Sequence, residues 1–207
     1  MTTLLQIDSS ITGPNSVSRT LTAAIVEKLC QANAGLQVIR RDLAAAAPAH
    51  VTPVNFPSAH PISAAAGDAP EFAAGRAASD AILDEFLGAD IIVIGAPMYN
   101  FSIPSQLKAW IDRILVPGKT FAYGADGLKG LASAKRVIIA VTRGNLYGAG
   151  QPTASFEHVE SYLRSVFAFI GIADPEIIIA EGVQLGPDAR EAALDKALQQ
   201  TAGLKAA

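Results

Sequence analysis

The residues best suited to chemistry in this chain lie at positions 96–108, which read APMYNFSIPSQLK. Their aromatic side chains can stack on a flat ring, and the amide of Asn100 can both donate and accept hydrogen bonds. This mixture differs from the Gly, Ser and Asp content of an ordinary connecting loop. The segment therefore predicts a site for a flat, hydrogen-bonding heterocycle, and a flavin ring is such a group. The alternative is that Met98 and Phe101 only close the edge of the core.

A second candidate is the serine-rich segment 9–19, between a strand-like run and a helix-like run. Backbone N–H groups at a helix start, together with the positive end of the helix dipole, favour an anion. The hydroxyls of Ser10, Ser16 and Ser18 can add hydrogen-bond donors. We interpret the segment as a candidate phosphate site; a simple helix cap at Asn15 or Ser16 is the alternative. Walker and Rossmann dinucleotide patterns are both absent, so those nucleotide sites lose support.

The third candidate, at residues 142–145, reads TRGN. Gly144 beside Asn145 suggests a tight turn with exposed N–H groups. Such donors could stabilise the negative charge of a reduced flavin. An ordinary strand-to-helix turn is the alternative, and this segment taken alone favours it.

Alternating strand and helix signals must position these loops, and they predict a parallel sheet with helices on both faces. Strands are predicted at residues 4–8, 36–40, 90–95, 136–142 and 176–180. Amphipathic helices are predicted at residues 16–31, 70–87, from about 104, 154–170 and 189–204. The pattern indicates a flavodoxin-like, doubly wound α/β fold with five parallel strands in the order 2-1-3-4-5. In that order the loops after strands one, three and four lie at one edge.

Two segments lack clear periodicity and are predicted as connections. Residues 44–67 are rich in Pro and Ala and long for a connector, so we expect them to be functional or partly mobile. Residues 118–134 are punctuated by glycines and link the third helix to the fourth strand. Because no repeat or domain linker is visible, we expect one domain over residues 1–207.

Composition narrows the classes of function. Half of the residues are hydrophobic and 17% are charged, which favours a folded core over disorder. No apolar run reaches the roughly 18 residues of a membrane span, and no signal peptide is visible. The single cysteine, Cys30, excludes an intrachain disulfide, and we expect a cytoplasmic protein. A net charge of −3 without a basic cluster disfavours nucleic acid as the partner, and the three histidines lack metal-ligand spacing.

With the three loops in this order, the chain resembles the FMN-dependent NADH-azoreductase family, whose members are flavodoxin-like quinone and azo-dye reductases. The similarity runs nearly end to end. Its most specific motif is APMYNF at residues 96–101 followed by QLK at 106–108. Further matches are RDLA at 41–44, GL at 127–128, FIGI at 169–172 and AEG at 180–182.

The resemblance implies where FMN binds. The implied contacts are Ser10, Ser16, Val17, Ser18, Met98, Tyr99, Asn100, Phe101, Thr142, Arg143, Gly144 and Asn145. The chain departs from the family at two positions. Asn145 replaces a glycine of many members, although asparagine tolerates left-handed backbone angles. Tyr147 stands where some members place a histidine beside the flavin, which leaves the polarity of the substrate side open.

The resemblance also implies a ping-pong reaction. NADH, or NADPH, passes hydride to the flavin, and a quinone or azo compound then takes it up; no protein nucleophile or metal is needed. The family implies a homodimer with a shared active site. We expect Phe121 and Tyr147 to line the substrate pocket and residues 54–62 to act as a lid. Which acceptor the cell uses stays open.

Two other classes of function remain. A flavodoxin-type electron carrier would bind FMN without oxidising NAD(P)H, but such carriers are usually strongly acidic, which fits a net charge of −3 poorly. A flavin-free binding module would have the serine-rich segment only as a helix cap, and the purified protein would be colourless.

Overall fold

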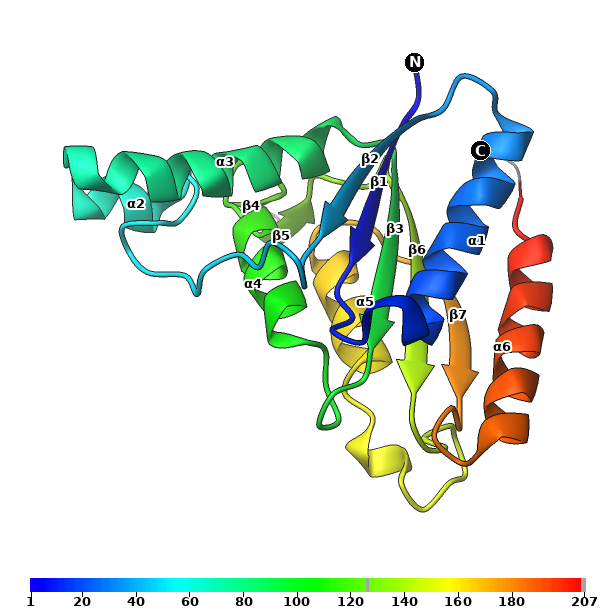
Figure 1. The fold of residues 1–207 in the computed structure, drawn as a ribbon. Coiled ribbons are helices and arrows are strands. Elements are labelled where there is room, and N and C mark those ends of the chain that lie inside the picture. Colours follow the sequence, from blue (N-terminus) through cyan, green and yellow to red (C-terminus); the bar gives the residue numbers. More distant parts are fainter. Residues whose placement is uncertain (126, 206–207) are drawn as a thin grey trace.

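A computed structural model describes residues 1–125 and 127–205, and its centre is a five-stranded parallel sheet (Figure 1). The strands are β1 (Thr3–Asp8), β2 (Gln37–Asp42), β3 (Ile91–Pro97), β6 (Arg136–Arg143) and β7 (Glu176–Glu181). Their order in the sheet is β2-β1-β3-β6-β7, with every neighbouring pair parallel. Since β6 and β7 are the fourth and fifth strands of this sheet, the predicted order 2-1-3-4-5 is confirmed.

Helices cover both faces of the sheet, as the alternating signals predicted. Figure 1 shows α1 (Val17–Ala32) and α6 (Pro187–Ala202) on one face. The other face carries α3 (Ala73–Gly88), α4 (Ser105–Ile114) and α5 (Glu160–Phe169). Strand β3 is buried along its whole length because successive side chains enter the two cores in turn: Val93 packs with α1, and Ile92 and Ile94 pack with Trp110 of α4.

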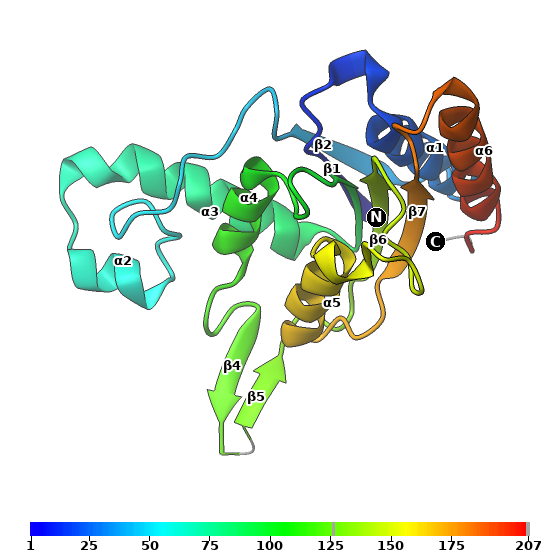
Figure 2. The same ribbon diagram turned by 90° about the horizontal axis from the view of Figure 1, so that it is seen from below.

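The two segments predicted as connections contain short elements that the sequence pattern did not indicate. Helix α2 (Pro61–Ala66) lies in the first segment and has His60 as its N-cap. The second segment forms an antiparallel hairpin of β4 (Phe121–Gly124) and β5 (Gly127–Gly130). Figure 2 shows this hairpin projecting away from the sheet. Elements of four to six residues are too short for a periodic signal, which explains why they were missed.

The helix predicted at residues 154–170 begins later than expected. A 3₁₀ turn, η3 (Ala154–Phe156), comes first, and α5 begins at Glu160. The carboxylate of Glu157 sets this start because it accepts the backbone N–H groups of Val159, Glu160 and Ser161. Phe156 therefore lies in the 3₁₀ turn, outside the helix predicted for it, and is 48% exposed.

The described residues contain neither a membrane-spanning helix nor a metal-binding cluster. None of their helices combines the length and hydropathy of a membrane span. No group of three or more His, Cys, Asp or Glu side chains is arranged to hold a metal ion.

Candidate functional site

The carboxyl ends of β1, β3 and β6 bring the three candidate loops together at one edge of the sheet. Two pockets lie there side by side, sharing Met98, Tyr99, Gly144 and Gln184. The serine pocket, of about 390 Å³, is also lined by Ser10, Thr12, Asn15, Ser16, Val17 and Arg190. The aromatic pocket, of about 700 Å³, is also lined by Ile11, Asn100, Phe101, Asn145, Tyr147 and Leu185. We call the two together the groove.

The serine pocket forms around the start of α1. A 3₁₀ turn, η1 (Gly13–Asn15), leads into the helix, and Ser16 is the N-cap, with its Oγ accepting the N–H of Arg19 at 3.2 Å. The amides of Val17 and Ser18 lie in the first turn, so the helix offers them no acceptor. Ser16 is thus a cap, as the alternative held, while neighbouring amides at the positive end of the dipole can still bind an anion.

Ser18 does not line the groove, although it was expected among the contacts. Its side chain is buried, and its Oγ lies 3.0 Å from that of Ser16. The hydroxyl of Ser18 therefore orients Ser16, while its backbone amide belongs to the helix start.

Arg19 holds the serine-rich loop from behind. Its guanidinium forms a bidentate ion pair with Asp42, both distances being 2.7 Å, and donates to the Ser10 carbonyl at 2.8 Å and 3.2 Å. The hydrogen bonds from Arg19, together with the backbone N–H groups of Ala44 and Ala45, hold the pKa of Asp42 below its ordinary value. Sequence reasoning did not single out Arg19, because its partner Asp42 lies in a different strand.

Asp8 lies behind the same loop, at the end of β1. Its carboxylate accepts hydrogen bonds from Thr22 at 2.7 Å and from Gln6 at 2.9 Å. Burial nevertheless raises the pKa of Asp8, because these hydrogen bonds and Arg19 compensate only in part.

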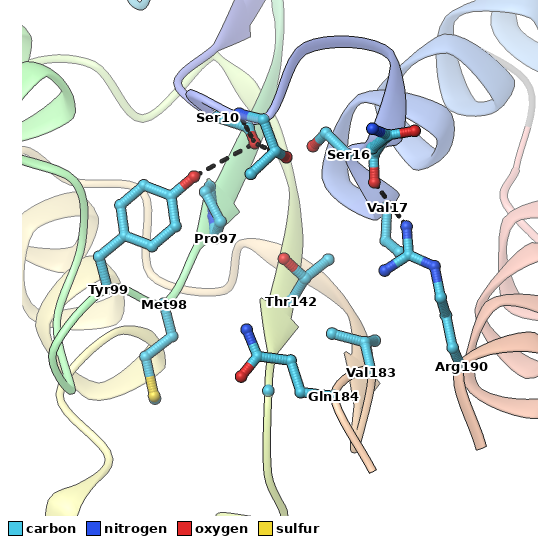
Figure 3. A pocket seen from close by; sticks show the side chains of 13 residues that line it. Ser10, Ser16, Val17, Pro97, Met98, Tyr99, Thr142, Val183, Gln184 and Arg190 are labelled. Carbon is cyan, nitrogen blue, oxygen red and sulfur yellow. Dashed lines mark hydrogen bonds between the residues drawn. The ribbon is translucent and has the colours of Figure 1, made fainter. Parts of the chain in front are cut away.

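Tyr99 ties the second loop to the first. Its hydroxyl lies 3.3 Å from Ser10 Oγ and accepts the N–H of Ile11 at 3.1 Å (Figure 3). The ring thereby forms a wall between the serine pocket and the aromatic pocket, with Met98 beside it.

The next two residues form a strained turn. Asn100 and Phe101 have φ angles of 48° and 73°. Tyr99 and Ser102 exchange backbone hydrogen bonds across them at 2.9 Å and 3.1 Å, as in a two-residue hairpin of type I′. Positive φ is tolerated by asparagine but costly for phenylalanine. Sequence reasoning chose this loop for its side chains and did not predict its backbone conformation.

Aromatic rings form one wall of the aromatic pocket. The ring of Phe101 lies 6.4 Å from that of Tyr147, edge to face, and 5.3 Å from that of Phe156. Tyr147 is held in turn by its N–H, which donates to Glu181 at 3.0 Å. Asn145 lines the pocket, and its φ angle is not positive. The tolerance of asparagine for left-handed backbone angles is therefore not needed at this position.

Arg143 is placed differently from its neighbours in the third loop. Its side chain is only 3% exposed and lies 3.0 Å from Glu160, 3.2 Å from Glu157 and 3.6 Å from Glu181. The guanidinium therefore points away from the groove and fixes the third loop to α5 and β7. Burial acts to raise the pKa of Glu157, but three backbone hydrogen bonds and Arg143 outweigh it, and the pKa is lowered.

Several groove residues come from a part of the chain that sequence reasoning did not consider. Val183, Gln184 and Leu185 follow β7, and Arg190 lies in the first turn of α6. The loop is docked by its backbone: the N–H of Val183 donates to Arg143 O at 3.2 Å and that of Gln184 to Gly144 O at 2.9 Å. The AEG match at residues 180–182 was the available signal.

Two expected contributors to the substrate pocket lie away from the groove of their own chain. Phe121 belongs to β4, and its ring packs 4.7 Å from that of Phe169. Residues 54–62 lead into the start of α2 and lie beside α3 (Figure 1), where Ser58 donates to Asp80 at 2.6 Å and 2.7 Å. Within one chain, neither segment covers the site.

The donor set of the groove fits a mononucleotide with a flat ring. Helix amides, hydroxyls and one guanidinium meet at the serine end, and aromatic side chains with the Asn100 amide meet at the other. The groove also lies where the strand order reverses, between β1 and β3. Fold and site together define a flavodoxin-like mononucleotide-binding protein.

Comparison with known proteins agrees. A family model described as the flavodoxin-like fold matches residues 2–204. The chain is 59% identical to FMN-dependent NADH:quinone oxidoreductase 2 of Bradyrhizobium diazoefficiens and 54% identical to FMN-dependent NADH:quinone oxidoreductase of Methylorubrum extorquens, each over 204 residues and 99% of both proteins. An azoreductase structure from Bacillus anthracis matches with a TM-score of 0.85 and 28% identity over 98% of each chain. The chain belongs to the flavodoxin-like family of FMN-dependent NADH:quinone oxidoreductases and azoreductases, which confirms the resemblance.

Proposed function

We propose that residues 1–207 form a single FMN-binding domain that oxidises NADH and reduces quinones, with azo compounds as a second class of acceptor. The observation that carries the proposal is the groove itself, whose two ends match the two ends of FMN. The names of the relatives support the same donor, cofactor and acceptor. Use of NADPH as a second donor is tested by comparing the rates of flavin bleaching with NADH and with NADPH.

The serine pocket is the end that would hold the phosphate. The amides of Val17 and Ser18 and the hydroxyls of Ser10, Thr12 and Ser16 are the available donors. Arg19 and Tyr99 keep Ser10 in place before any ligand arrives. Preorganised donors lose less conformational entropy on binding, which favours a tightly held cofactor.

The aromatic pocket is the end that would hold the ring. When bound, FMN supplies the redox chemistry, accepting two electrons from NADH and delivering them to the acceptor. The chain's part is to orient and to exclude water: the strained turn presents Asn100, and Phe101 and Tyr147 form an apolar wall. Backbone N–H groups near Gly144 and Asn145 are suited to stabilise negative charge on the ring.

We also propose that the working form is a homodimer in which the partner completes the groove. The hairpin projects away from the sheet (Figure 2). Its strands carry exposed apolar side chains, Tyr123 at 73% and Leu128 at 46% exposure. A two-stranded hairpin is marginally stable alone, so a partner surface would stabilise it. In such a dimer Phe121 and residues 54–62 would act at the partner's groove, as substrate wall and lid.

The dimer can be tested by measuring molar mass with size-exclusion chromatography and light scattering. Tyr123→Glu should lower the molar mass to that of a monomer. Leu87→Glu makes the same change in charge at an exposed residue of α3 and should leave the molar mass unchanged. A wild-type monomer with full activity would refute the dimer. A Phe121→Ala protein that keeps its flavin and kcat/KM for every acceptor would refute the role of Phe121.

The function itself is tested by the visible spectrum under anaerobic conditions. We expect a yellow protein that bleaches with NADH and regains its colour with a benzoquinone. A yellow protein that NADH cannot bleach would indicate an electron carrier. A colourless protein that takes up no added FMN would refute the proposal. We place the protein in the cytoplasm, where NADH is available and Cys30 stays reduced, and cell fractionation tests this.

A further inference from the structure

Among the described residues that line the groove, Arg190 is the single ionised side chain. The other polar groups of these residues are hydroxyls and amides, and none of them is a carboxylate. We infer that Arg190 binds the phosphate of the cofactor and sets the preference for FMN over riboflavin. This inference rests on the proposed function and adds a residue that the three-loop interpretation did not contain.

The position of Arg190 follows from the start of α6. The helix begins at Pro187, and the N–H of Arg190 donates to Gly186 O at 3.0 Å. Its guanidinium crosses to the serine pocket, where Nη2 donates to the carbonyl of Asn15, the residue just before the N-cap of α1 (Figure 3). One cation thus stands beside the helix start at which the amides point outward.

The remaining donors of this guanidinium are available for a ligand. Arginine carries five N–H groups, and the Asn15 carbonyl takes one of them. Among the described residues, no carboxylate forms an ion pair with Arg190. A phosphate is the anion that a planar guanidinium binds best, since two parallel hydrogen bonds can form.

The ion pair behind the loop leaves Arg190 as the cation on the groove side. Arg19, the other cation near Ser10, is bound to Asp42 on the side away from the groove. Asp8 lies in the same cluster, so two carboxylates there face one guanidinium. A phosphate dianion in the serine pocket would therefore meet Arg190 as an unpaired cation on its own side, whereas Arg19 is already paired with Asp42.

The test compares FMN with riboflavin, which lacks the phosphate, by quenching of flavin fluorescence on addition to the apoprotein. Arg190→Gln should weaken FMN binding roughly 10- to 100-fold, the worth of a hydrogen bond to a charged group. Riboflavin binding should stay unchanged. Arg190→Lys should recover part of the FMN affinity, and added salt should weaken FMN binding more in the wild type than in Arg190→Gln.

Lys196→Gln is the matched control, since it removes one positive charge from an exposed position on the same helix. Its FMN affinity should stay within twofold of the wild type. Equal losses for FMN and riboflavin in Arg190→Gln would overturn the inference, because they would show that Arg190 only holds the loop through Asn15. Unchanged FMN affinity would overturn it as well. A wild-type apoprotein that binds neither flavin would instead refute the proposed function.

Discussion

The strained turn of the second loop gives a prediction whose sign is unusual: Phe101→Gly should be more stable than Phe101→Ala. Both variants lose the same ring, so they differ only by one Cβ. At a φ of 73° that Cβ costs about 1–2 kcal/mol. Glycine loses roughly 0.5–1 kcal/mol more backbone entropy on folding. The difference leaves the glycine variant more stable by roughly 0.5–1 kcal/mol.

The control is the reverse substitution at an ordinary position. Ala192 is exposed in α6, where Ala192→Gly should lower the free energy of unfolding by about 1 kcal/mol. Glycine should therefore stabilise relative to alanine at position 101 and destabilise at position 192. The two effects have opposite signs, so an error in the assumed cost of glycine relative to alanine cannot produce both.

Urea denaturation of the apoprotein, followed by far-ultraviolet circular dichroism, measures all four proteins. With an m-value of about 1–3 kcal/mol/M, a change of about 1 kcal/mol should shift the urea midpoint by roughly 0.3–1 M. If Phe101→Ala is as stable as Phe101→Gly while Ala192→Gly shows its expected loss, the positive φ is not imposed by the fold. The reasoning that links the strained turn to the site would then fail.

Three further predictions concern buried charges and the hairpin. Glu157→Gln should lower the free energy of unfolding by about 1 kcal/mol near neutral pH, because the pKa of Glu157 is lowered in the folded protein. The wild type loses this stability as the pH falls through the folded pKa. In acid the variant should therefore match the wild type. Asp8→Asn should be more stable than the wild type near neutral pH. The pKa of Asp8 is raised in the folded protein, so ionisation of its carboxyl group disfavours folding. The gain in stability should vanish in acid, where the carboxyl group is protonated in both states. Denaturation at several pH values tests both, and equal differences at all pH values would contradict them. Gly130→Ala should lower the Tm strongly, because its Cβ would lie 2.1 Å from the backbone N of Gly171, whereas Gly124→Ala meets no atom within 4 Å and should change stability by less than about 0.5 kcal/mol.

The sheet could be predicted because the amino-acid composition of its strands reflects their burial. Strand β3 reads IIVIGAP and is buried throughout, as parallel strands with two covered faces must be. Once the strand order followed from the alternation with helices, the convergence of the three loops followed too. The hairpin could not be predicted in this way, since its position depends on the close approach of Gly130 to Gly171, a contact between distant parts of the chain.

The residue types of the site were predicted better than the directions of their side chains. Arg143 lies in the third loop as expected, but carboxylates of α5 and β7 draw its guanidinium away from the groove. Arg190 was missed because its hydrogen-bond partner Asn15 is 175 residues away in the sequence. Local patterns identify a loop, whereas a charged side chain turns toward partners that only the complete fold brings near.

The placement of charge explains how a groove with little formal charge can still be rigid. Arg19 with Asp42 fixes the first loop and Arg143 with three glutamates fixes the third, and both clusters lie behind the surface that a ligand would meet. Ion pairs of this kind can hold a backbone in place without competing with a ligand for hydrogen bonds. The front of the groove then needs only neutral donors and one cation. A substitution behind the loops should therefore weaken binding through loss of order, affecting FMN and riboflavin alike, whereas loss of Arg190 should affect FMN alone.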